Sequence, residues 1–163
     1  MLVAGRTPWL REAHSLFADP RGGCNTVRAM HILAALFIDA IDLRPVPGPS
    51  TRIDLTGIQF SAPAPGPVPV TIEPHLVVLV HCPEGAKNTG ALEVVYRRPG
   101  GEQPGDEPLA RNVQPLEVEP GKFNYRLVRA ELEFDDYITV EAHCRIDMGP
   151  AMVVPYTLLP PVE

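Results

Sequence analysis

The strongest constraint on the fold of this chain is an unbroken run of strand-forming residues near its middle, His75-Leu-Val-Val-Leu-Val-His-Cys82. Pro74 and Pro83 bound the run, and proline ends regular hydrogen bonding because it has no backbone N–H. Apolar side chains fall on both faces of such a strand. Val77 and Leu79 point to one face, and Leu76, Val78 and Val80 point to the other. Since a strand that is apolar on both faces is normally covered on both, we predict that this run is the central strand of the core.

The rest of the chain is divided into short segments. It holds 20 prolines and 13 glycines among 163 residues, which favours strands joined by stiff turns over long helices. The length fits one domain with a sizeable core, and because aromatic residues make up only 6%, that core must be mainly aliphatic.

Apolar and alternating patterns predict further strands on both sides of the central one. Gly57 inside the second of them indicates a bulge or a close backbone approach, and the proline-rich segment 62–70 predicts a stiff crossover between sheets. A polar loop is expected at 99–110. The predicted strands are 31–43, 50–60, 91–98, 113–118, 126–134, 138–146 and 151–159.

The clearest alternation lies near the C-terminus, in 126–134 and 138–146, each with one apolar and one polar face. This pattern is typical of antiparallel strands with one side in water. We expect the two strands to form a hairpin in which Phe134 lies opposite Ile138 and Leu132 opposite Val140.

The predicted fold is all-β, an antiparallel β-sandwich of immunoglobulin-like or jelly-roll-like type with about eight strands. We place this domain at residues 30–163. Residues 1–29 form an N-terminal extension with one short helix at Pro8–Ala18, where Thr7 is the N-cap. A second interpretation takes Met30 as the true start, with the first 29 residues outside the domain.

Charge and composition disfavour several classes of partner. The net charge of −6 argues against nucleic acid and against anionic membranes, both of which require clustered basic residues. No apolar run approaches the roughly 20 residues of a membrane helix, and the N-terminus lacks the apolar core of a signal peptide. An odd number of cysteines, three, does not indicate a secreted disulfide framework, so we expect a cytoplasmic protein.

Chemistry-bearing motifs are few. The sequence lacks Gly-x-Ser-x-Gly, His-Glu-x-x-His and the phosphate-binding glycine loops, and we expect no catalytic residue and no cofactor. A dipeptide does recur, as His81-Cys82 and His143-Cys144. If the two strands were neighbours, His81 and His143 could hold a metal on one face, while Cys82 and Cys144 could form a disulfide or thiol pair on the other. The simpler interpretation is two small buried cysteines and two surface histidines.

The order of these elements allows a comparison with a known group. An opening apolar strand with an acidic exit, the Asp54-Leu-Thr-Gly57 segment, a proline-rich crossover into a buried strand and a Pro-Gly-Lys-Phe-Asn-Tyr-Arg-Leu element follow one another. This order resembles a group of short, uncharacterised actinobacterial and other bacterial β-sandwich proteins. The resemblance covers about residues 30–146 and implies a fold and a bacterial cytoplasmic setting, but no functional residue.

Our functional hypothesis from sequence is a non-enzymatic protein that acts through contacts with a protein partner or with itself, as a homodimer. It rests on the missing catalytic motifs, on the apolar tail at 151–159 and on an expected polar sheet face. A metal-binding or enzymatic role of the two His-Cys pairs, and a small-ligand carrier with a cavity between the sheets, are the alternatives. The residues expected on the polar face are Arg129, Glu131, Glu141, His143 and Arg145.

Overall fold

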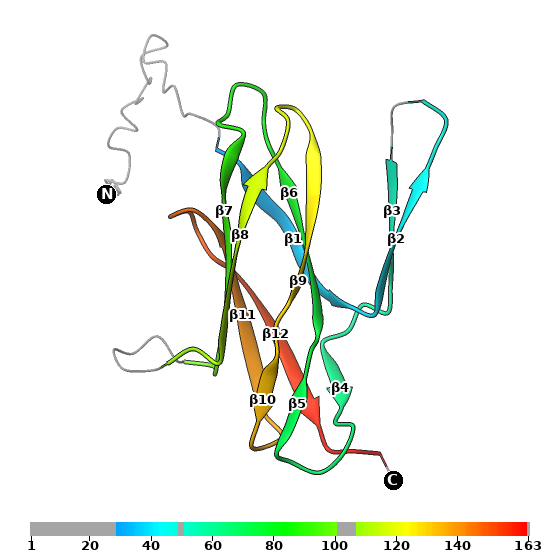
Figure 1. Ribbon diagram of the computed structural model, residues 1–163, viewed down its shortest axis with the longest axis vertical. Coiled ribbons are helices and arrows are strands. Elements are labelled where there is room, and N and C mark those ends of the chain that lie inside the picture. Colours follow the sequence, from blue (N-terminus) through cyan, green and yellow to red (C-terminus); the bar gives the residue numbers. More distant parts are fainter. Residues whose placement is uncertain (1–28, 49–50, 101–106, 163) are drawn as a thin grey trace, which may run out of the picture.

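The computed structural model describes residues 29–48, 51–100 and 107–162, and this part of the chain is all-β (Figure 1). Within those ranges there are strands and no helix. The predicted helix at Pro8–Ala18, and any boundary within residues 1–28, lie outside the described residues. The strands are β1 (His31–Ile38), β2 (Ala40–Pro45), β3 (Thr51–Thr56), β4 (Ser61–Pro63), β5 (Val70–Ile72), β6 (His75–His81), β7 (Thr89–Arg97), β8 (Ala110–Glu117), β9 (Phe123–Arg129), β10 (Leu132–Phe134), β11 (Thr139–Ile146) and β12 (Met152–Leu159).

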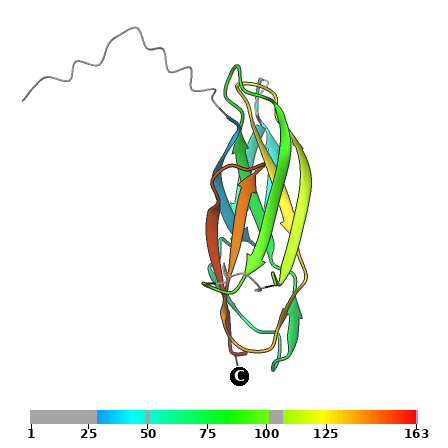
Figure 2. The ribbon, with the colours of Figure 1, turned by 90° about the vertical axis from the view of Figure 1, so that its left-hand side faces the viewer.

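Two larger sheets and two small ones organise these strands. One sheet has the order β1-β6-β9, and the other has the order β4-β12-β11-β7-β8. Neighbours are antiparallel except for β4 and β12, which are parallel. The pairs β10-β5 and β2-β3 are separate two-stranded sheets, and most strands run roughly along the longest axis of the molecule (Figures 1 and 2).

Strand β6 is the middle strand of its sheet, as the sequence predicts. Leu76, Val78 and Val80 are fully buried in the main core. On the opposite face Val77 is also fully buried, whereas Leu79 is half-buried. The second face of β6 is therefore covered only in part.

Side chains from both larger sheets form one hydrophobic core. Phe37 of β1 contacts Tyr156 of β12, with ring centroids 4.8 Å apart. Val94 and Tyr96 of β7 are fully buried in the same cluster. Since the cluster joins the two sheets, burial of aliphatic and aromatic side chains between them is the main stabilising contribution.

The hairpin expected near the C-terminus is wrong in its pairing. Strand β9 pairs with β6, β10 pairs with β5, and β11 pairs with β7 and β12. Phe134 therefore faces Val70 instead of Ile138. The cause is that Val128 of β9 and Val140 of β11 point into the same core from different sheets. An amphipathic alternation fits strands that face each other across a core as well as strands that lie side by side.

The predicted strand 31–43 is divided at Asp39. Strand β1 stays in the core, while β2 leaves it and forms a hairpin with β3 that projects from the body of the molecule (Figure 1). The close approach expected at Gly57 is confirmed: its φ is +64°, and a Cβ there would overlap the Asp39 carboxylate. The proline-rich crossover leads from β4 in the five-stranded sheet to β6 in the three-stranded one.

Candidate functional site

The two His-Cys dipeptides lie in different sheets. Strand β6, which carries His81, has β1 and β9 as neighbours, and β11, which carries His143, has β7 and β12. Cys82 and Cys144 point into the core, so the histidines beside them point away from it, from opposite sides of the molecule. The condition for a shared metal site, that the two strands are neighbours, is not met.

Each histidine has local contacts of its own. The His81 ring stacks on Phe123, with centroids 4.5 Å apart, and meets the edge of His31 at 5.2 Å. The Nε2 atom of His143 lies 3.2 Å from Oε2 of Glu141. Among the described residues, no three His, Cys, Asp or Glu side chains are grouped in a way that could hold a metal ion.

Both described cysteines are fully buried free thiols. The Cys82 Sγ donates to the carbonyl oxygens of Pro83 and Lys87, both at 3.8 Å. Burial raises the pKa of Cys144 to about 12, because the thiolate would lose its hydration. A thiol with so high a pKa is a poor nucleophile at neutral pH, which fits the interpretation as a small core residue. The Cys82–Cys144 pairing itself stays a prediction.

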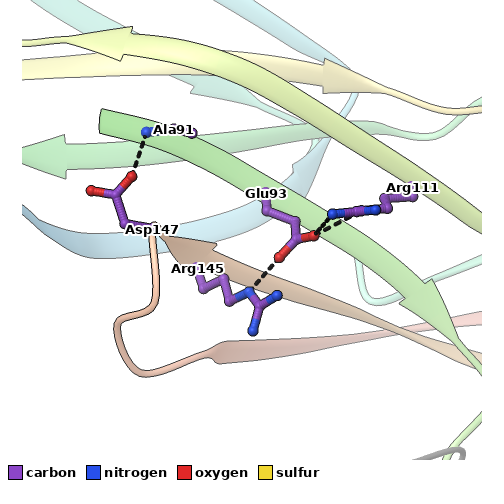
Figure 3. A network of polar contacts seen from close by, with 5 residues as sticks. All are labelled: Ala91, Glu93, Arg111, Arg145 and Asp147. Atoms are coloured by element: carbon purple, nitrogen blue, oxygen red, sulfur yellow. Dashed lines mark hydrogen bonds and ion pairs between the residues drawn. The ribbon is translucent and has the colours of Figure 1, made fainter. Parts of the chain in front are cut away.

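A charged network crosses the outer face of the five-stranded sheet (Figure 3). The carboxylate of Glu93 accepts hydrogen bonds from Arg111 on one side, with Nε at 2.7 Å, and from Arg145 Nε on the other. Hydrogen bonds from Arg145 and Arg111 hold the pKa of Glu93 below its usual value, although burial acts in the opposite direction. Since Arg111 lies on β8 and Arg145 on β11, the Glu93 carboxylate links the three neighbouring strands β8, β7 and β11.

Next to this network the backbone turns sharply at Asp147. Its φ is +49°, and its Oδ1 accepts a 2.9 Å hydrogen bond from the Ala91 N–H (Figure 3). This contact ties the β11–β12 turn to β7. Of the expected polar face, Glu141, His143 and Arg145 do share one face of β11. Arg129 belongs to β9 in the other sheet, and Glu131 lies between β9 and β10.

The most unusual feature of the structure is the β2-β3 hairpin. Ile41 lies opposite Leu55 and Leu43 opposite Ile53, so all four apolar side chains share one face. The other face carries Asp42, Arg44, Arg52 and Asp54. None of the described side chains in the two strands is buried, and Leu43 is 48% exposed.

The stem of the hairpin is held firmly to the body. The Asp39 N–H donates to the carbonyl oxygens of Thr56 at 3.0 Å and Gly57 at 3.2 Å, and Gln59 N–H donates to Phe37 at 3.0 Å. The Gln59 side chain also donates to Oδ1 of Asp39 at 3.0 Å. These bonds fix how the hairpin leaves the core, and it stands clear of β6 and β9 (Figure 1).

Sequence reasoning missed this element, although a signal was present. Two short runs, 40–45 and 51–56, alternate apolar and polar or charged residues, and a Val-Pro-Gly-Pro-Ser segment separates them. Alternating runs joined by a Gly- and Pro-bearing turn are typical of a hairpin. We instead read the first run as the end of a buried strand.

A small-ligand carrier requires a cavity that is large enough for a ligand. A pocket of about 340 Å³ lies where β1 meets the β11–β12 turn, with Met30, Ile32, Ile146 and Met152 in its wall. Its volume is at the lower end for ligand sites, which start at about 300 Å³. It opens at the rim of the sheets, whereas the carrier hypothesis places the cavity between them.

A scan against protein-family models gave no match, and a search of the curated proteins found no similar sequence. The resemblance to bacterial β-sandwich proteins therefore stays an expectation. Within the described residues there is no helix long and apolar enough to cross a lipid bilayer.

Proposed function

We propose that this protein is a β-sandwich that acts through protein contacts and that the β2-β3 hairpin is its main contact surface. The observation that supports this proposal most strongly is that four apolar side chains share one face of the hairpin, in which none of the described side chains is buried. Net charge −6 fits a protein partner in the cytoplasm better than nucleic acid or an anionic membrane.

The strand order favours an immunoglobulin-like sandwich over a jelly roll. Successive strands alternate between the sheets: β6 lies in the first, β7 and β8 in the second, β9 in the first, and β11 and β12 in the second. In immunoglobulin-type sandwiches the chain also alternates between the sheets, with strands A, B, D and E in one sheet and C, F and G in the other. The hairpin is then an insertion between the first strand and the crossover.

Elementary energetics support a partner for the hairpin. An isolated two-stranded hairpin is only marginally stable in water, and stability normally requires a third strand or packing of the apolar face. Fully burying a leucine side chain contributes roughly 1.5–3 kcal/mol, so covering the exposed half of Leu43 would add about 1 kcal/mol. A firmly anchored stem presents this face without a large ordering cost.

Site-specific photocrosslinking tests the proposal. A photoreactive benzoylphenylalanine replaces Leu43 in one variant and Val113, an exposed apolar residue on β8, in a matched control. We expect a discrete crosslinked product from position 43 that excess unlabelled wild-type protein competes away. An excess of the Leu43→Ser/Ile53→Ser protein should not compete. The absence of a product at position 43, or the same products from both positions, would contradict the proposal.

A further inference from the structure

We propose that the partner of the β2-β3 hairpin is a second copy of this chain, bound edge to edge along β3 about a two-fold axis at Ile53. This inference rests on the proposed function of the hairpin. Two features of β3 support it, the open edge of the strand and the order of charged residues along the strand.

The charges of one hairpin are poorly matched among themselves. The register places Asp42 directly opposite Asp54 and Arg44 directly opposite Arg52, and like charges at opposed positions repel. A diagonal ion pair between Arg44 and Asp54 relieves part of this, and it lowers the pKa of the Asp54 carboxyl. Within the described residues Arg52 is exposed and has no carboxylate within ion-pair distance, although its charge helps to lower the pKa of Asp54.

A second copy matches these charges. Along β3 the order is Arg52-Ile53-Asp54, which is self-complementary when reversed. In an antiparallel pair centred on Ile53, Arg52 lies opposite Asp54 of the second copy, and Asp54 lies opposite Arg52 of that copy. Both pairs fall on the charged face, while the two Ile53 side chains meet on the apolar face.

The edge of β3 is open for such pairing. In the described structure the sheet order is β2-β3, so the outer edge of β3 has no neighbouring strand. Strand β3 contains no proline, whereas β2 ends in Pro45, which has no N–H to give to a ladder. The same centred arrangement on β2 would set Pro45 opposite Ile41 of the second copy. The outer edge of β3 is therefore the better pairing surface.

Pairing would also give the hairpin the additional strands that a stable sheet needs. It turns two separate two-stranded sheets into one of four strands, which is above the size at which a sheet with an apolar face becomes stable. Each copy contributes Ile41, Leu43, Ile53 and Leu55 to that face. The contact is closed by its own symmetry and leaves no free copy of the β3 edge.

Complementary charge variants test this arrangement. The Arg52→Asp chain presents Asp at both positions and the Asp54→Arg chain presents Arg at both, so each repels itself but matches the other. By sedimentation we expect wild-type dimers, a dimer Kd weakened on the order of tenfold or more for each variant alone, and dimers again in the equimolar mixture. Thermal unfolding should show that both variants fold, because the lost ion pair of Asp54 is at the surface.

A crosslink across the two-fold axis gives a second readout. In a Cys24→Ser background, Ile53→Cys should form an intermolecular disulfide on oxidation. Opposed Cα atoms of an antiparallel pair lie about 4.5–5.5 Å apart, within the range of about 4.4–6.8 Å that disulfides span. Leu43→Cys, on the other strand, is the matched control and should stay unlinked. Equal linking at both positions would overturn the β3 register.

Three outcomes would overturn the second copy as partner: a wild-type monomer at all concentrations, variants that dimerise like wild type, or a mixture that does not associate. If the photocrosslink from position 43 then joins a different protein, the contact role of the hairpin stands and only its partner is wrong. If neither assay gives a product, the proposed function falls as well.

Discussion

Replacing Tyr96 by phenylalanine should make the protein more stable. Tyr96 is fully buried near the C-terminal end of β7, and its hydroxyl has no hydrogen-bond partner among the described residues. Burial raises the pKa of this hydroxyl far above its usual value. A buried polar group without a partner costs about 1–3 kcal/mol of desolvation. The space left by one oxygen, roughly 10 Å³, costs only about 0.2 kcal/mol at 24 cal/mol per Å³.

We therefore expect Tyr96→Phe to raise the free energy of unfolding by about 1–2 kcal/mol. The measurement is urea unfolding with an unchanged m-value, supported by a rise in Tm of about 2–8 °C. Tyr156→Phe is a useful comparison, because that ring also lies in the core and packs on Phe37. A loss of 1 kcal/mol or more in Tyr96→Phe would show that the hydroxyl is paired and would refute the reasoning.

Three further predictions concern the charged network, the hairpin stem and the core thiol. Glu93→Gln should lose about 1 kcal/mol at pH 7. Because the folded pKa of Glu93 is depressed, its contribution is present above the usual carboxyl pKa and is lost as pH falls through the folded value, so urea unfolding of variant and wild type should converge in acid. Gly57→Ala should lower the free energy of unfolding by at least about 1–2 kcal/mol, because the left-handed φ of residue 57 disfavours a side chain. The new Cβ would also displace the Asp39 carboxylate, so hydrogen exchange at the Asp39 amide should become faster. Cys144 should react with thiol reagents only at the rate of global unfolding, which peptide mass spectrometry measures; fast labelling in native buffer would contradict its burial.

The sequence predicts the strands better than it predicts their partners. The run at His75–Cys82 is the middle strand of a sheet because proline bounds it and both faces are apolar. Strands β7, β11 and β12 also lie close to their predicted positions. The pairing of 126–134 with 138–146 failed because alternation states which face is apolar, but not which neighbour shares the sheet.

The same limit applies to the candidate site. The sequence shows that the His-Cys dipeptide occurs twice, as His81-Cys82 and His143-Cys144. Only the sheet order shows that the strands carrying the two dipeptides are not neighbours. The Glu93 network was equally out of reach, because it joins Glu93 to Arg111 on the next strand and to Arg145, which lies 52 residues farther along the chain. The hairpin was within reach, since the alternation in 40–45 and 51–56 is local.

Hydrogen exchange along β3 tests most directly the central claim, that the hairpin is a protein contact surface that pairs with a second copy along β3. Amide exchange of β3 and β6 is followed by mass spectrometry at low and high protein concentration. We expect protection of β3 to rise with concentration, because a second copy would bind its open edge, while β6, already paired on both sides, stays constant. Exchange in β3 that is fast and independent of concentration would contradict the two-fold contact proposed for this hairpin.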